Sequence, residues 1–349
     1  MKSVVNKRTK ANMRARVLGL ALFATVAAAP GAQATPIVIV PDAGLAANTA
    51  ALAAFNRAAT TLGNLFSDPI TVTINANLAS LGAGIIGSTS ATLLVGGYTL
   101  VRNQMVADAA NEADDAIVAA LPTAAQFLAQ VPAGFTLDGR VILSQANAKA
   151  LGFAVGAGAD AAITFSSNFS FDYDNSDGVA AGLIDFETVA LHELVHALGF
   201  ISWVDQINGA APSATFFTTL DMFRFAANNA PTTTAEFTTK ARNFVPGAAA
   251  VTSDVANNWA MSTGLGVGGD GRQASHWKDD SLTGSHIGIM DPTLSSGLVF
   301  GLTDADIRAL DLIGWDQAAP VPEPASILLL GSGLVAVIRN RKRRGQTIQ

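Results

Sequence analysis

Residues 185–200 read DFETVALHELVHALGF, and this stretch predicts a helix that carries a metal site. Asp185 can cap the start of the helix, and Gly199 can adopt the left-handed conformation that ends it. His192 and His196 stand four residues apart, so their side chains lie on one face, about 6 Å apart along the axis. Two imidazoles placed in this way can bind one zinc ion.

Glu193 predicts what such a zinc ion would do. It follows the first histidine directly, so its carboxylate can reach a water molecule on the metal. Zinc lowers the pKa of that water and polarises a carbonyl group, while the carboxylate removes the proton. Hydrolysis of an unactivated amide bond needs both effects. We therefore expect a zinc-dependent metallopeptidase with Glu193 as its general base.

A catalytic zinc site needs a third protein ligand and one open coordination position. The chain has 4 histidines and no cysteine, so His276 and His286 are the remaining imidazoles. The downstream glutamates are Glu236, with no neighbouring aspartate to orient it, and Glu323, close to the C-terminus. The composition therefore favours a histidine as third ligand and leaves both candidates open.

The stretch His192–Phe200 resembles the zinc helix of the metzincin metalloproteases. In most metzincins the third histidine follows three residues after the glycine, a position that Ser202 occupies here. The leishmanolysin-like branch instead inserts a long segment and supplies the histidine between serine and tryptophan, as in Ser275-His276-Trp277. The resemblance implies that His276 is the third ligand.

The segment Ile289-Met290-Asp291-Pro292 resembles the Met-turn that lies beneath the metal in this family. By this likeness Met290 is the Met-turn residue, Gly199 forms the turn after the zinc helix, and Thr164–Ser170 is the edge strand that pairs with an extended substrate. One feature departs from the family. Both tyrosines precede the zinc helix, so none follows the Met-turn to stabilise an oxyanion, and zinc would do most of that with a backbone donor.

The N-terminus predicts export. Residues 1–16 carry six basic side chains, Val17–Ala28 is apolar, and Ala32-Gln33-Ala34 has the small-x-small pattern of a cleavage site. This order is typical of a secretory signal peptide, assigned here to residues 1–34. A membrane anchor is the alternative, but the apolar run is shorter than the roughly 20 residues that a span requires.

The C-terminus, residues 319–349, has a matching three-part pattern. A Pro-Glu-Pro segment at 322–324 is followed by the mostly apolar Ile327–Ile338 and the basic Arg339–Arg344. This order resembles the PEP-CTERM sorting signal of Gram-negative bacteria. The resemblance implies partners in the export and sorting machinery, cleavage near the Pro-Glu-Pro segment, and a secreted or cell-surface location. A plain C-terminal anchor is the alternative.

Charge narrows the range of partners. The two ends hold 11 of the 21 basic residues and 1 of the 27 acidic residues, so the region between them carries 10 basic and 26 acidic residues, a net charge of −16. Such an excess argues against nucleic acid and anionic membranes as partners of the mature form. The absence of cysteine excludes disulfides and a thiol nucleophile. We expect a protein or peptide substrate.

The expected fold is α+β. The resemblance covers residues 185–316, is weak before residue 160, and implies a metzincin-like domain with two subdomains on either side of an active-site cleft. The N-terminal subdomain, 35–200, would hold a twisted sheet and the zinc helix. The C-terminal subdomain, 201–318, would hold a long insertion, the third ligand and the Met-turn.

Local patterns predict the main elements of this fold. The expected elements are helices at 44–64, 98–120 and 303–312, strands at 70–74 and within 161–173, a small-residue loop at 82–92, and a loop-rich insertion at 203–270.

Three alternatives remain. Asp172, Asp174 and Asp177 could bind calcium, but the glycine and the twelfth-position glutamate of a helix-loop-helix calcium site are missing, so a surface turn is the preferred interpretation. The protein could be a non-catalytic surface or matrix protein with a structural zinc site, which would need His286 as a fourth ligand. It could also hydrolyse a non-peptide amide or ester.

Overall fold

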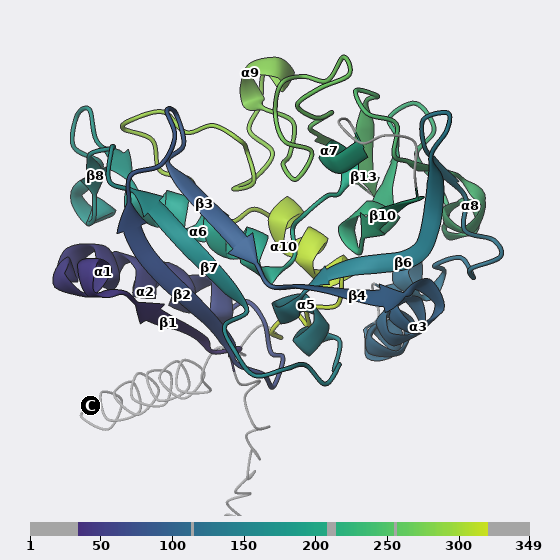
Figure 1. Cartoon of the computed structure of the whole chain (residues 1–349), viewed down its shortest axis with the longest axis horizontal. Helices are drawn as coiled ribbons and strands as arrows, with labels where there is room; N and C mark the ends of the chain where they lie inside the picture. Colours follow the sequence, from purple (N-terminus) through teal and green to yellow (C-terminus); the bar gives the residue numbers. More distant parts are fainter. Residues whose placement is uncertain (1–33, 113–114, 208–213, 255–256, 320–349) are drawn as a thin grey trace, which may run out of the picture. The chain divides into compact units, whose positions relative to one another are not determined.

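A computed structural model describes residues 34–112, 115–207, 214–254 and 257–319 (Figure 1). The predicted signal peptide and sorting signal lie almost wholly outside these residues. The described part mixes helices and strands, which confirms the α+β class. None of its helices has the length and apolar character needed to cross a membrane.

The first sheet has four strands, β1 (Ile37–Pro41), β2 (Val72–Ala79), β7 (Ala161–Ser166) and β3 (Gly87–Ala91), in the order β1-β2-β7-β3. The first three are parallel, and β3 runs antiparallel to β7 at the edge (Figure 1). The expected strand at 70–74 therefore exists, shifted toward the C-terminus.

Two predictions about this sheet were wrong. Residues 82–92 are not all loop, because 87–91 form the edge strand β3. Thr164–Ser170 is not an edge strand, because β7 lies between β2 and β3 and uses both of its edges. The reason is compositional. The strand Gly-Ser-Thr-Ser-Ala has no large β-branched or aromatic residue to mark it, but its small side chains let it lie close to the zinc helix.

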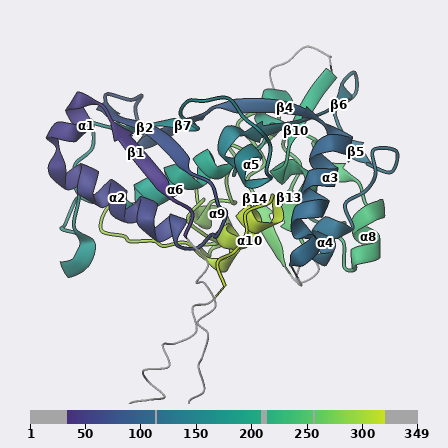
Figure 2. The same cartoon turned by 90° about the horizontal axis from the view of Figure 1, so that it is seen from below.

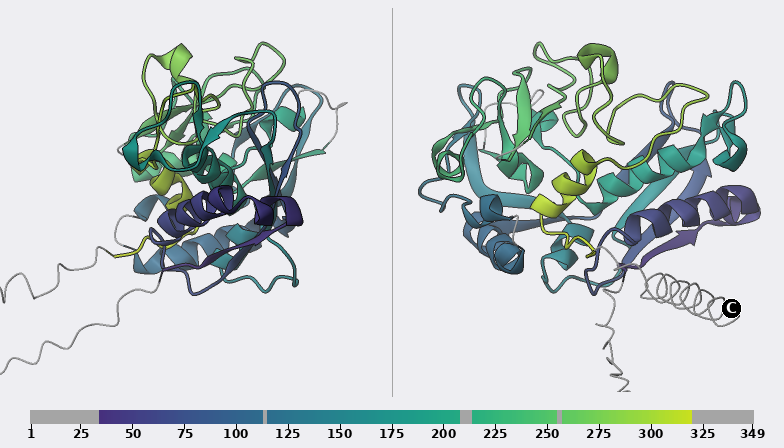
Figure 3. Two further views of the ribbon diagram at one scale, coloured as in Figure 1. Left: turned by 90° about the vertical axis from the view of Figure 1, so that its left-hand side faces the viewer. Right: turned by 180° about the vertical axis from the view of Figure 1, so that it is seen from behind.

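Two helices cover one face of this sheet. α2 (Thr49–Gly63) and the zinc helix α6 (Phe186–Leu198) run side by side across it (Figure 3, right). Between them, the ring of Phe165 on the sheet lies 4.9 Å from that of Phe55 on α2 and 4.4 Å from that of Phe186 on α6. This aromatic contact fixes α6 relative to the strands that line the site.

The ends of the zinc helix agree with the prediction. The Asp185 carboxylate accepts a hydrogen bond of 2.8 Å from the Thr188 backbone N–H, and Gly199 ends the helix with φ of 123°. A Cβ at residue 199 would lie 3.1 Å from atoms of Asn147 and Ile313. Both the backbone angle and the packing therefore require glycine there.

The predicted helix at 44–64 is divided in two. Asn48 separates α1 (Ala43–Ala47) from α2, and its side chain accepts a hydrogen bond of 3.1 Å from the Ala51 backbone N–H. The predicted helix at 303–312 is confirmed as α10 (Asp304–Leu312), with a capping box formed by Thr303 and Asp306.

The segment 203–270 is rich in loops, as predicted, but the prediction missed its short strands. It supplies strands to two further sheets, ordered β10-β6-β4 and β14-β13-β11-β12-β5. Their strands are β4 (Leu93–Gly97), β5 (Ala129–Gln130), β6 (Thr136–Ser144), β10 (Ala214–Thr218), β11 (Arg224–Ala226), β12 (Arg242–Asn243), β13 (Ala250–Ser253) and β14 (Asn258–Met261). Because the pairs are short and join distant segments, local sequence carries little signal for them.

Both of these sheets contain strands from before and after residue 200, the predicted subdomain boundary. The shorter helices α3, α4 and α8 lie beside them, away from α1 and α2 (Figure 2). The remaining elements are α3 (Tyr98–Asp108), η1 (Ala109–Asn111), α4 (Ala116–Ala119), α5 (Gln145–Ala150), β8 (Phe171–Asp172), η2 (Asn175–Asp177), β9 (Ile184–Asp185), α7 (Val204–Ile207), η3 (Leu220–Phe223), α8 (Thr234–Thr239) and α9 (Asp280–Thr283).

The start and end of the described part meet at a buried carboxyl group. Phe66 and Gln317 form an antiparallel bridge, and the Asp68 carboxylate accepts a hydrogen bond of 3.2 Å from the Asp316 backbone N–H. Asp68 is 1% exposed. Burial, and then the charge of Asp316, raise the pKa of Asp68 from 3.8 to about 7.

This raised pKa predicts a pH-dependent stability. Between about pH 4 and pH 7 the folded state keeps the Asp68 proton while the unfolded chain has lost it, so this group lowers stability as the pH rises through that window. Asp68→Asn removes the effect and keeps the acceptor oxygen. We expect a stabilisation of roughly 2 kcal/mol near pH 8 and almost none near pH 4, measured by thermal unfolding. Equal shifts in melting temperature at both pH values would contradict it.

Candidate metal centre and active site

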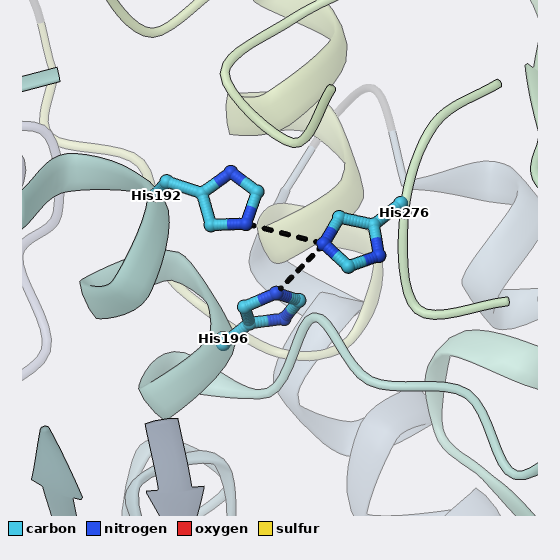
Figure 4. Close-up of side chains that lie close together, drawn as sticks. All are labelled: His192, His196 and His276. Atoms are coloured by element: carbon cyan, nitrogen blue, oxygen red, sulfur yellow. Dashed lines mark hydrogen bonds between the residues drawn. The ribbon is translucent and has the colours of Figure 1, made fainter. Parts of the chain in front are cut away.

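Three histidines converge on one point (Figure 4). The Nε2 atom of His276 lies 3.2 Å from that of His192 and 3.3 Å from that of His196. Nitrogens bound tetrahedrally to one zinc ion at about 2.0–2.1 Å lie roughly 3.4 Å apart, so these distances match a shared ion. The structure thus brings together the two helix histidines and His276, the third ligand that the family resemblance implied.

The contacts of the three Nδ1 atoms show which nitrogen of each ring carries the proton. The Nδ1 atoms of His192, His196 and His276 contact the backbone carbonyls of Ile289, Phe200 and Gln273 at 2.7, 2.8 and 3.2 Å. A carbonyl accepts hydrogen bonds only, so each Nδ1 carries the proton and each Nε2 carries a lone pair. Three lone pairs that face one another are suited to bind a cation, and imidazoles oriented by carbonyl groups are common metal ligands.

Two of the three histidines, His196 and His276, are held neutral, as metal ligation requires. Burial, and then the charge of His192, lower the pKa of His196 to about 3. Burial, followed by the charges of His196 and His192, lowers the pKa of His276 well below its usual value. Protons therefore do not compete with a metal for these two side chains near neutral pH.

Two serines explain how a distant histidine reaches the site. Ser202 stands where most metzincins have their third histidine. Its backbone carbonyl accepts a hydrogen bond of 3.3 Å from the Ser275 hydroxyl, and its backbone N–H donates one of 2.9 Å to the same hydroxyl. The segment carrying His276 thus lies directly against the turn after the zinc helix. His276 therefore reaches the site through tertiary contacts, although it lies far from the helix histidines in the sequence.

A buried carboxylate fixes the floor of the site. Asp306 is 0% exposed and accepts hydrogen bonds from Trp277 Nε1 at 2.8 Å and from the backbone N–H groups of Ile289 and Met290 at 2.7 and 3.4 Å. Because the Ile289 carbonyl orients His192, Asp306 connects the loop that carries His276 to the loop that orients His192. Met290, the expected Met-turn residue, is fully buried.

Glu193 is held by the edge strand β3. Its carboxylate accepts a hydrogen bond of 2.7 Å from the Thr89 hydroxyl, and it is 5% exposed. Burial raises its pKa, against the opposing effects of His192 and of the Thr89 hydrogen bond. Gly87 leaves the space for it, since a Cβ there would lie 2.5 Å from Glu193 Oε1. Sequence reasoning missed Gly87 and Thr89 because it assigned their segment to a loop.

A cleft of about 500 Å³ surrounds these groups. One wall is β3 with the preceding loop, including Ile85, and the opposite wall contains Leu265 and the segment after the Met-turn, including Leu294 and Phe300. All three histidines and Glu193 reach its surface. The catalytic candidates therefore share one concave site with apolar sides.

Two other predicted candidates lie elsewhere. His286 is not part of the three-histidine cluster but stands near Asp280 and Asp291 on the cleft wall. Asp172 and Asp174 accept backbone hydrogen bonds from Ala180 and Ser176 within a surface turn, as the preferred interpretation expected. The described residues group no metal ligands at that turn.

Comparison with known proteins identifies one segment of the chain. Residues 320–344 match the PEP-CTERM protein-sorting motif. No curated protein and no solved structure matches the chain. The motif confirms the predicted sorting signal, which implies interaction with the export and sorting machinery and a secreted or surface location in a Gram-negative bacterium.

The convergent nitrogens predict a ranking of zinc affinities. His276→Ala should weaken tight zinc binding by more than about 100-fold, since even groups that only orient a ligand are worth about 10- to 100-fold. His286→Ala should leave this tight site intact. Competition with a chromophoric chelator measures both, and the reverse ranking would make His286 the third ligand.

The close approach of β3 predicts a second effect. Gly87→Ala should displace the Glu193 carboxylate and lower kcat/KM by about 100-fold for any reaction that uses this base, while zinc content stays unchanged. Gly97→Ala is the matched control, because φ is −65° there and an added Cβ meets nothing within 4 Å. Full activity of the Gly87 variant would show that the position of Glu193 does not depend on β3.

Proposed function

We propose that the protein is an exported zinc metalloendopeptidase, related in design to the metzincins. The observation that carries the proposal is the convergence of the three Nε2 atoms of His192, His196 and His276 beside the buried carboxylate of Glu193. Zinc, when bound, would polarise a peptide carbonyl and lower the pKa of a water molecule. Peptide-bond hydrolysis uses both effects.

Glu193 then acts as the general base. Burial raises its pKa, so the carboxylate is a stronger base than it would be on the surface. Thr89 bonds Oε2 and holds the carboxylate in one orientation. After the attack, the same carboxyl group can pass the proton to the leaving amine.

The edge strand supports a peptide rather than another amide or ester. β3 pairs with β7 along one edge only, and its residues Gly87–Thr89 line the cleft. An extended peptide can add to such an edge through main-chain hydrogen bonds, which position the scissile bond without regard to side chains. This role belongs to β3, and replaces the earlier assignment to Thr164–Ser170.

The structural-zinc alternative needs a fourth protein ligand, which the sequence could supply only through His286. Within the described ranges, the cluster comprises three histidines and no carboxylate or further imidazole. Three protein ligands and one open position are typical of catalytic zinc. This ligand count favours an enzyme over a non-catalytic surface or matrix protein.

The decisive experiment compares the purified protein with Glu193→Ala on a denatured protein substrate in the presence of zinc. The parent should cleave, and a chelator should abolish cleavage. The variant should keep its zinc, because Glu193 is not a ligand, and lose at least about 100-fold in activity.

Three results would count against the proposal. Loss of tight zinc in Glu193→Ala would make the carboxylate a ligand. Cleavage that survives the substitution would assign the base elsewhere. A folded, zinc-loaded parent without activity on any denatured protein would favour the non-catalytic surface protein.

A further inference from the structure

A second cluster of side chains that can bind a metal lies beside the same cleft, and two of its three members, His286 and Asp291, line it. It consists of Asp280 at the start of α9, His286 in the loop that follows, and Asp291 directly after Met290. One ligand atom from each lies within 4.8 Å of the others. The cluster is separate from the three histidines and takes no part in the proposed hydrolysis.

His286 gives the most direct indication of an absent ligand. Both of its ring nitrogens are buried and lack a hydrogen-bond partner. The nearest charged atom, Asp291 Oδ2, lies 4.0 Å from Nδ1, too far for a hydrogen bond. A neutral imidazole with both its donor and its acceptor buried and unsatisfied is destabilising unless a ligand completes it. Stacking on Phe300, with ring centroids 4.0 Å apart, fixes the ring in this orientation.

The two carboxylates lack a positively charged partner. Asp291 is 5% exposed and accepts backbone hydrogen bonds from Asp280 and Thr293 at 2.9 Å each. Among the described residues no lysine or arginine pairs with Asp280 or Asp291; His286 is the nearest cationic candidate. Two neighbouring carboxylates beside an imidazole lone pair make a site for a divalent cation.

We propose that Asp280, His286 and Asp291 form a second zinc-binding site. One imidazole and two carboxylates are ligand types that zinc accepts, whereas calcium prefers six to eight oxygens. A common zinc ion needs ligand atoms roughly 3.4 Å apart, so the side chains close slightly on binding. Asp280 is half-buried at a helix start and has room to move.

The second zinc ion would restrict the loop that orients His192 at the three-histidine site. Residues 280 and 291 bracket this loop, which includes Ile289, and the Ile289 carbonyl holds His192 in its tautomer. Joining the two ends through His286 would restrict the loop without adding a group to the reaction. The second zinc would take no part in the reaction, and its existence does not depend on peptide hydrolysis.

The test is the number of zinc ions per chain, measured by equilibrium dialysis and elemental analysis. The parent should bind two. His286→Ala and Asp280→Asn should each bind one, and His276→Ala should also bind one, because it removes the other site. Asp304→Asn is the matched control: it neutralises an exposed aspartate at the start of α10 and should still bind two.

Asp280→Asn keeps the size of the side chain, so it decides the matter even if His286→Ala fails to fold. A parent that binds one zinc, with Asp280→Asn unchanged, would overturn the second site. Displacement of the second zinc by equimolar calcium would overturn the assignment of the metal. His276→Ala tests the three-histidine site separately, because this variant should lose only the zinc bound there.

Discussion

Three imidazole lone pairs directed at one point are the constraint around which this structure is organised. Without a cation such an arrangement is unfavourable, so the surrounding fold must hold each ring in place. It does so through three backbone carbonyls, at Ile289, Phe200 and Gln273, each of which fixes one tautomer. These carbonyls come from three different segments, and the fold has to bring those segments together before a metal can bind.

The buried carboxylate of Asp306 does much of this work. It bonds Trp277, beside the third histidine, and the backbone of Ile289 and Met290, beneath the first. It also completes the capping box of α10 through Thr303. One side chain thus couples the start of a helix to both loops of the metal centre. A charged group can be buried here because hydrogen-bond donors satisfy it on several sides.

The two walls of the cleft have different roles. The edge strand β3 holds Glu193 and offers unpaired backbone to an extended chain, while the opposite wall contributes apolar side chains and the cluster of Asp280, His286 and Asp291. Export through the sorting signal places these groups outside the cytoplasm. Without cysteine, the stability of the protein in that environment depends on core packing rather than on disulfides.

The sequence by itself determined the local parts of this site. The i, i+4 spacing placed His192 and His196 on one helix face, and the residues at 185 and 199 set the helix ends, because helical geometry and capping depend on near neighbours. The capping box at 303–306 and the C-terminal sorting signal could be read for the same reason. Tertiary structure alone decided what depends on distant contacts. It brings His276, which the sequence indicated only through a family resemblance, to the two helix histidines by bonding Ser275 to Ser202. It also made 87–91 an edge strand although its residues carry no strand signal. It also paired the short strands of 203–270 with segments from before residue 150. Such pairings depend on packing between segments far apart in the chain, which no local pattern encodes.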